Sequence, residues 1–223
     1  MATEKFNEIG KGGIVKEGIF VRFPELIPAE GSNYWRGDGK RKRLLLIGES
    51  NYFTRDWAEK SVFMDAERWY KEDTDKLIPE EKKTDVSNYI DYPTFNKVFD
   101  IMDKVLDENG IEHERGLGEG AFYNYFLRPA LSEGGNRGFK PENIDNEVAG
   151  VALAGIIQVI SPDIIIFLSK KAYLAFKAYC ERNGLSYANI YIDHLSHPSS
   201  SWWYRYECAR RFEELLNKYW INH

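Results

Sequence analysis

The sequence predicts one α/β domain with three layers, in which helices cover both faces of a central, mostly parallel sheet of about four strands. Short apolar runs alternate with helical stretches along the chain, as expected for parallel strands joined by crossover helices. The length of 223 residues fits one domain of the usual size, and 13 Phe, 14 Tyr and 6 Trp supply a large core. We therefore interpret residues 1–223 as a single domain.

The chain begins with an irregular leader over residues 1–43, rich in Gly, Pro and Asn, which we expect to pack on the main domain. We predict one short strand in it, around Ile19 to Phe23. Residues 54–92 form an insertion that we expect to be partly helical. Its acidic, Lys-rich portion from Glu67 to Asp91 is typical of a solvated surface.

The predicted strands are unbroken apolar runs, a pattern typical of strands buried on both faces of a parallel sheet. They are Leu44–Gly48, Ala121–Tyr125, Asp163–Leu168 and Asn189–Asp193.

Helices are predicted between and after these runs. An apolar stripe with helical spacing ends before Gly110, and it consists of Phe95, Val98, Phe99, Met102, Val105 and Leu106. Residues from Ile144 to Ile160 are apolar on nearly all sides and predict a buried helix. Ser169 is a candidate N-cap for a helix that ends before Gly184, and a last amphipathic helix runs from Ala209 to Tyr219.

Composition narrows the function classes. The formal net charge of −5 argues against a non-specific nucleic-acid coat, although a local basic patch remains compatible with it. Cys180 and Cys208 form neither a metal-binding nor a disulfide pattern, and we expect reduced thiols on helices. The first residues lack the apolar stretch of a secretory signal, and no run is long enough to span a membrane. We expect a cytoplasmic protein without membrane or metal partners.

Ligands of open parallel sheets bind beyond the carboxyl ends of the strands. Polar side chains follow all four predicted strands, in the segments Gly48–Phe53, Asn124–Pro129, Ser169–Lys171 and Asp193–Ser199. An acid, a hydroxyl, amides, imidazoles and an arginine should therefore meet at one edge of the sheet.

These segments, in this order, resemble the motifs of the uracil-DNA glycosylase superfamily. The likeness covers residues 44–215 and comprises a Gly-led polar segment after the first strand, an Asn after the second, a Pro-Asp strand that leads into a helix, and a late His-Pro-Ser. Residues 93–99, Pro-Thr-Phe-Asn-Lys-Val-Phe, are similar to the start of a helix in that family. The resemblance implies the uracil-DNA glycosylase-like fold.

The resemblance also implies roles for single residues. The family's first motif falls on Gly48, Glu49, Ser50, Asn51, Tyr52 and Phe53, with Ser50 at the position of its water-activating carboxylate. Asn124 falls on the residue that reads the base, and Tyr52 or Phe53 would stack on it. His197 falls on the stabiliser of the leaving base, with Ser199 beside it. Glu49, Ser50 or Asn51 would hold the attacking water.

The activity implied is hydrolysis of the N-glycosidic bond of uracil or another deaminated or damaged base in DNA, after base flipping. Trp202 and Trp203 would fill the gap in the duplex, or belong to the core. Basic residues that could contact phosphates are Lys40–Arg43, Arg128, Lys170, Lys171 and Arg205. The chemistry needs no metal or organic cofactor, and two cysteines cannot ligate the iron–sulfur cluster of some branches.

Two other functions fit the same residues. In a Ser-His esterase, His197 would activate Ser50, Asp193 would orient His197, and Asn124 would contribute to the oxyanion site. Alternatively, the fold binds a nucleobase or nucleic acid and has lost catalysis. The sequence does not decide between these functions, and it leaves the base specificity and the oligomeric state open.

Overall fold

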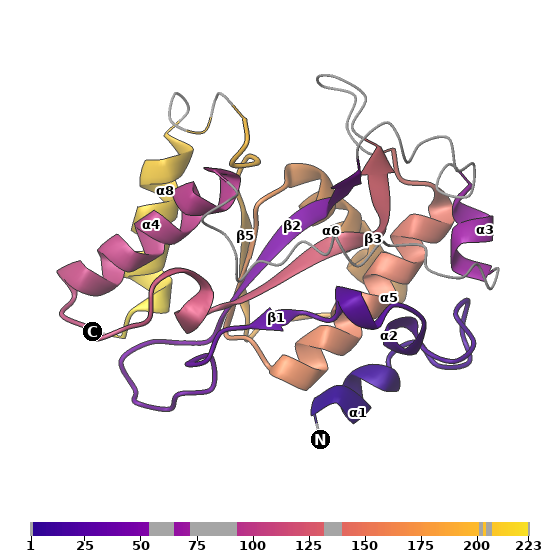
Figure 1. Cartoon of the computed structure of the whole chain (residues 1–223), viewed down its shortest axis with the longest axis horizontal. Helices are drawn as coiled ribbons and strands as arrows, with labels where there is room; N and C mark the ends of the chain where they lie inside the picture. Colours follow the sequence, from indigo (N-terminus) through magenta and orange to yellow (C-terminus); the bar gives the residue numbers. More distant parts are fainter. Residues whose placement is uncertain are drawn as a thin grey trace.

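A five-stranded, mostly parallel sheet forms the centre of the computed structural model, which describes residues 2–53, 65–71, 93–131, 140–200, 203 and 207–222 (Figure 1). The strand order is β1-β3-β2-β4-β5, and only β1, at one edge, runs antiparallel to its neighbour. The strands are β1 (Ala29–Glu30), β2 (Leu44–Phe53), β3 (Ala121–Leu131), β4 (Ile164–Phe167) and β5 (Tyr191–His194).

Helices cover both faces of this sheet, which confirms the three-layer α/β/α prediction (Figure 1). One face packs against α1 (Ala2–Asn7), α2 (Ile19–Arg22), α3 (Ala66–Lys71), α5 (Asn143–Ile160) and α6 (Lys170–Asn183). The other face packs against α4 (Pro93–Glu108), α8 (Cys208–Leu215) and the π-helical turn η7 (Leu216–Trp220). Short 3-10 turns lie at η1 (Pro24–Leu26) and η6 (Gly116–Glu119).

The predicted helix ends agree with the structure. Gly110 follows α4 with a φ of 63°, and Gly184 ends α6 with a φ of 63°, a left-handed conformation that glycine adopts without strain. At the start of α6, the Ser169 hydroxyl accepts a hydrogen bond from the Ala172 amide. Cys180 and Cys208 are free thiols on α6 and α8.

The two central strands run beyond their predicted ends. β2 continues to Phe53 and β3 to Leu131, and they pair with each other past the end of β4. Ser50 pairs with Phe126, whereas Tyr52 pairs with Ala130, so that a bulge accommodates Pro129, which has no N–H to donate. The polar residues after Gly48 therefore lie on a strand, which continues beyond the predicted end of β2 at Gly48.

The leader contains no strand at Ile19 to Phe23. Ile19 to Arg22 form the short helix α2, which starts after Gly18 at a φ of 111°. The side chains of Ile19 and Phe20 are buried, and the Phe20 ring meets the Phe6 ring edge to face at 5.9 Å. Adjacent buried residues suit this helical turn against α1 better than a strand, in which they would point in opposite directions.

Part of the insertion belongs to the core. Helix α3 lies inside the segment predicted to be solvated, yet Trp69 and Tyr70 are buried. The Trp69 ring stacks on Phe23 of the leader, with centroids 4.2 Å apart and planes 6° apart. The rest of the insertion, residues 54–64 and 72–92, lies outside the described residues. Among the described helices, none combines the length and apolar character needed to cross a bilayer.

Candidate functional site

A cavity of about 180 Å³ lies at the carboxyl end of β2, between the sheet and the start of α4. Five chain segments contribute to its wall: β2, β3, the residue Leu168 directly after β4, the first turn of α4, and the loop after β5. The lining residues are Gly48, Ser50, Asn51, Thr94, Phe95, Phe122, Asn124, Leu168, His197 and Pro198. The structure thus brings together the predicted residues Gly48, Ser50, Asn51, Asn124 and His197.

Strand alternation explains how Gly48, Ser50, Phe122 and Asn124 reach the cavity, whereas Asn51 lines it beside the irregular register between Ser50 and Tyr52. Leu44 and Leu46 of β2 face α4 and α8. Gly48 and Ser50 follow at intervals of two residues, so they lie on the same face of the strand. Phe122 and Asn124 of β3 follow the same rule. A Cβ added to Gly48 would lie 2.2 Å from the Asn124 Oδ1 atom, so only glycine lets the Asn124 amide lie against β2.

The amides of Asn124 and Asn51 are linked, since the Asn124 Nδ2 group donates to the Asn51 Oδ1 atom at 2.9 Å. Beside them, the Ser50 side chain is buried, and its hydroxyl has no hydrogen-bond partner among the described residues. A buried hydroxyl without a partner is unfavourable by about 1–3 kcal/mol. This cavity therefore offers a polar ligand a hydroxyl that is already desolvated.

His197 is held in one tautomer. Its Nδ1 atom accepts a hydrogen bond from the Ser199 backbone N–H at 3.2 Å and lies 2.7 Å from the Ser199 hydroxyl. Because a backbone N–H only donates, Nδ1 is the unprotonated nitrogen and Nε2 carries the proton of the neutral ring. Burial lowers the pKa of His197, against the opposing effect of the Glu49 charge. The ring is thus a neutral hydrogen-bond donor at the cavity.

Glu49 does not line the cavity, because it points to the opposite face of the sheet from Gly48 and Ser50. Its carboxylate accepts hydrogen bonds from the Ser169 hydroxyl at 2.7 Å and the Lys171 ammonium at 2.8 Å. The side chain is 11% exposed and still acts electrostatically on His197. The carboxylate is therefore fixed next to the cavity.

The aromatic walls of the cavity differ from those predicted. Phe95 and Phe122 line it, with their rings edge to face at 5.1 Å. Phe122 could have been identified from its position two residues before Asn124 on the same strand face, whereas Thr94 and Phe95 carry no comparable signal. The side chains of Tyr52 and Phe53, and the whole of Trp202, lie outside the described residues. Trp203 is fully buried and packs near Phe212, so it belongs to the core.

Several predicted phosphate contacts are engaged in ion pairs. Arg128 is buried and paired with Asp145, and Arg41 is buried and paired with Glu119. Arg43 pairs with Asp163, and Lys171 with Glu49. The run Lys40–Arg43 precedes β2 and so lies at the opposite end of this strand from the cavity. Arg205 lies outside the described residues.

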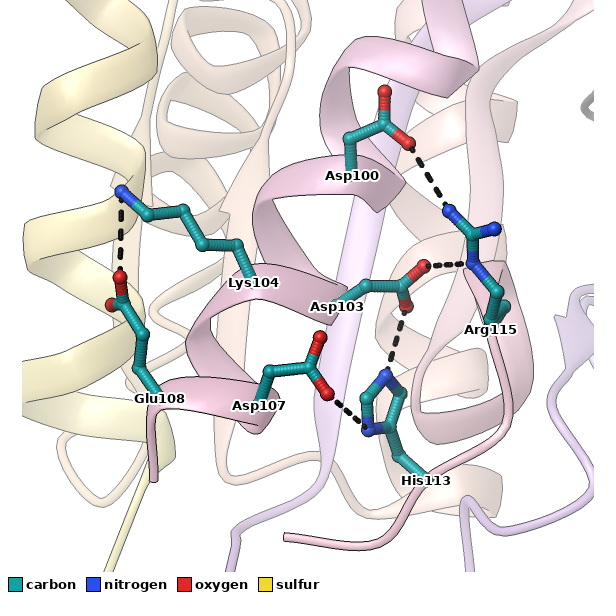
Figure 2. Close-up of a pocket in the computed structure, with 7 residues that line it drawn as sticks. All are labelled: Asp100, Asp103, Lys104, Asp107, Glu108, His113 and Arg115. Carbon is teal, nitrogen blue, oxygen red and sulfur yellow. Dashed lines mark hydrogen bonds and ion pairs between the residues drawn. The ribbon is translucent and has the colours of Figure 1, made fainter. Parts of the chain in front are cut away.

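A second hollow, of about 460 Å³, is lined by charged side chains of α4 and the segment after it (Figure 2). Figure 2 shows that these groups face one another: the His113 Nε2 atom lies 3.6 Å from Asp103, and the Arg115 Nε atom 3.3 Å from the same carboxylate. Within the described ranges, no group of His, Cys, Asp or Glu side chains is placed to hold a metal ion. The charges of this hollow pair within the protein.

Fold and cavity together define an α/β protein with a small, partly apolar cavity at the carboxyl edge of its sheet. No protein-family model and no curated protein matches this chain.

Proposed function

We propose that the cavity binds a single nucleobase flipped out of DNA and that the protein hydrolyses its N-glycosidic bond. The observation that carries the proposal is His197, a neutral donor fixed by Ser199 beside the Asn51–Asn124 amide pair. A volume of about 180 Å³ is below the roughly 300–1,000 Å³ of sites for drug-sized ligands, and it suits one heterocyclic ring system.

Each group has a role in this reaction. When the bond between base and sugar breaks, its electron pair stays on the base, and the Nε2–H of His197 donates to a base oxygen that gains negative charge. The Asn124 amide and the Ser50 hydroxyl bind polar edges of the base, while Phe95 and Phe122 contact its apolar surface. Water adds to C1′ of the sugar and loses a proton to Glu49, the carboxylate whose charge acts on His197.

The test uses single-stranded and duplex oligonucleotides that contain uracil, hypoxanthine, xanthine or a mismatch, with abasic sites scored by alkaline cleavage. We expect cleavage of at least one substrate and a decrease of about 10²- to 10³-fold for His197→Gln, as for loss of a fixed donor. His194→Gln is the matched control, because His194 stacks on Tyr173 at 4.5 Å and does not line the cavity. Absence of cleavage of every substrate would refute the hydrolase.

A binding module without turnover is the second candidate. It is favoured by the cavity lining, in which none of the described residues is a carboxylate. Calorimetric titration with free bases separates the two functions. Binding that is lost in Asn124→Ala, combined with intact oligonucleotides after long incubation, would identify the binding module.

The contacts of Asp193 do not favour an esterase. Its carboxylate accepts hydrogen bonds from Arg211 at 2.7 Å and from Tyr191 at 3.0 Å, and the Nδ1 atom of His197 is engaged by Ser199. A triad would need that Nδ1 atom to donate to the carboxylate. We therefore expect no labelling of Ser50 by a fluorophosphonate probe, and labelling that disappears in Ser50→Ala would favour the esterase.

A further inference from the structure

An exposed tryptophan lies far from the cavity, in the loop between β1 and β2. Tyr34 and Arg41 anchor this loop in the protein and are 3% and 8% exposed, whereas all residues from Trp35 to Lys40 are exposed. Figure 1 shows the loop extending from the body of the molecule below the sheet, at the ends where the parallel strands begin. At 54% exposure, Trp35 is the most exposed large apolar side chain among the described residues.

The indole ring of Trp35 is exposed but fixed in place. Its Nε1–H donates to the Glu30 carboxylate at 2.5 Å, and its edge-to-face contact with the Tyr34 ring has centroids 5.2 Å apart. The Arg43 guanidinium lies 5.8 Å from the ring centroid, and Asp163 in turn holds this guanidinium. Three neighbours thus orient a ring that keeps more than half of its surface accessible. A ring held in this way loses little conformational entropy when it binds a ligand.

Exposed basic residues follow Trp35 in the same loop. Lys40 and Lys42 are exposed, and their ammonium groups form no ion pair with any residue that the structure describes. Arg36 is half exposed and pairs with Asp38 at 3.4 Å. The nearby acids have assigned partners, since Glu30 binds the indole N–H, Asp38 binds Arg36 and Arg41, and Asp163 binds Arg43. The Lys42 charge also acts on Asp163, but neither lysine forms an ion pair with a described residue, so both ammonium groups can contact an anionic partner.

We propose that Trp35, Lys40 and Lys42 form a binding site for single-stranded nucleic acid, in which an unpaired base stacks on the indole and the lysines contact adjacent phosphates. An accessible aromatic ring beside mobile cations is the combination that binds unpaired strands without sequence preference. A duplex buries the faces of its bases, so it offers this ring no stacking surface. The site is separate from the cavity, and the proposal holds whether or not the cavity cleaves a glycosidic bond.

The test measures binding of a dye-labelled, undamaged oligothymidylate of about 12 nucleotides to the full chain by fluorescence anisotropy at low salt. We expect Trp35→Ala to weaken binding by about 5- to 100-fold, the range for loss of one stacked base. Trp35→Phe, which keeps a ring, should retain part of the affinity. Leu174→Ala, which removes another half-exposed apolar side chain on α6, should have no effect.

The lysines predict a second readout. The slope of log Kd against log salt should decrease by about 0.7 for each lost phosphate contact in Lys40→Ala and Lys42→Ala, whereas Lys177→Ala on α6 should leave it unchanged. The same measurements on His197→Gln should give unchanged affinity, which separates this site from the cavity. Equal affinity of Trp35→Ala and the unaltered chain, or no binding at low salt, would overturn the proposal. A Trp35 requirement seen only with phosphatidylserine vesicles would overturn it in favour of a membrane surface.

Discussion

The Ser50 hydroxyl lowers the stability of the free protein and can form a hydrogen bond with a ligand. Its buried hydroxyl has no hydrogen-bond partner among the described residues and lines the cavity. Such a group lowers stability unless a ligand supplies the missing hydrogen bond. Its presence in the cavity wall is therefore an argument for a polar ligand that does not depend on any resemblance.

This argument predicts opposite effects of Ser50→Ala on stability and binding. We expect the free energy of unfolding to stay constant or rise, by up to about 1–3 kcal/mol, because the variant no longer buries an unpaired hydroxyl. Affinity for the base should fall about tenfold, the effect of one lost hydrogen bond of roughly 1.4 kcal/mol. Urea unfolding and calorimetric titration measure the two effects.

Tyr123→Phe is the matched control for Ser50→Ala. The Tyr123 hydroxyl is also buried without a partner among the described residues, but it faces the core beneath the other helical layer. Its removal should stabilise the protein in the same way and leave base affinity unchanged. A loss of affinity of equal size in both variants would show that Ser50 acts through general stability.

Gly48 predicts a steric effect at the same wall. In Gly48→Ala, the new methyl group would lie 2.2 Å from Asn124 Oδ1 and 2.9 Å from the Phe122 ring, so the Asn124 amide must move. Overpacking of this kind typically costs about 1–3 kcal/mol. We expect this loss in urea unfolding, together with weakened base binding. Gly37→Ala, with no atom within 4 Å of the added Cβ, should change neither quantity.

At the scale of elements, a buried ion pair joins three segments around the far end of β3. Arg128 donates to both oxygens of Asp145 on α5, at 2.8 and 2.5 Å, and Tyr70 of α3 donates to the same carboxylate at 3.1 Å. The Glu142 amide adds a fourth hydrogen bond at 2.8 Å. Arg128, which the sequence suggested as a phosphate ligand, therefore fixes α3 and α5 to the extended part of β3.

Breaking this pair should be strongly destabilising. Asp145→Asn leaves the buried Arg128 charge with only the half-exposed Glu142 carboxylate, 3.6 Å away, and we expect a loss of about 3–5 kcal/mol in urea unfolding. Tyr70→Phe removes one hydrogen bond and should cost about 1 kcal/mol. Glu207→Gln breaks an exposed pair with Arg210 and should change stability by less than about 1 kcal/mol. Similar losses in Asp145→Asn and Glu207→Gln would contradict a structural role for the buried pair.

The elements also show what sequence patterns could predict. Two local patterns predicted the type and start of their elements well: the apolar run Leu44–Gly48 for β2 and the apolar stripe for α4. The extension of β2 and β3 depends on pairing between residues 50–53 and 126–131, which no local pattern contains. The insertion was misread because its charged composition outweighed the two aromatic residues that α3 buries.

For the whole molecule, the parallel topology alone predicts where the candidate cavity lies. The carboxyl ends of neighbouring strands meet at one edge, and this is where Gly48, Asn124 and the His197 loop come together. The same rule could not find Thr94 and Phe95, because they begin a helix and follow no strand. The rule also says nothing about Lys40 and Lys42. They precede β2 and therefore lie at the opposite end of the sheet from the carboxyl ends of the strands.

The fold also predicts how stability depends on pH. Burial lowers the pKa of both His197 and His194 from the usual value of about 6.5. A histidine with a lowered pKa in the folded state takes up its proton more readily in the unfolded state. The contribution of these two histidines to the free energy of unfolding is therefore fully present above a pH of about 6.5, and it is lost as the pH falls below that value. Asp163 and Asp193, whose pKa values are also lowered, lose their contribution only nearer pH 4.

Urea unfolding at pH 7.5 and at pH 5.5 should therefore show a loss of stability that is smaller in His197→Gln and in His194→Gln than in the unaltered chain. Asp103, whose pKa is raised by burial, is present in all three proteins, so its titration does not affect the comparison. An equal loss in all three would show that neither ring is buried as described. If the loss is smaller in His197→Gln, the same burial that lowers acid stability keeps the His197 ring a neutral donor below its usual pKa, as the proposed reaction requires.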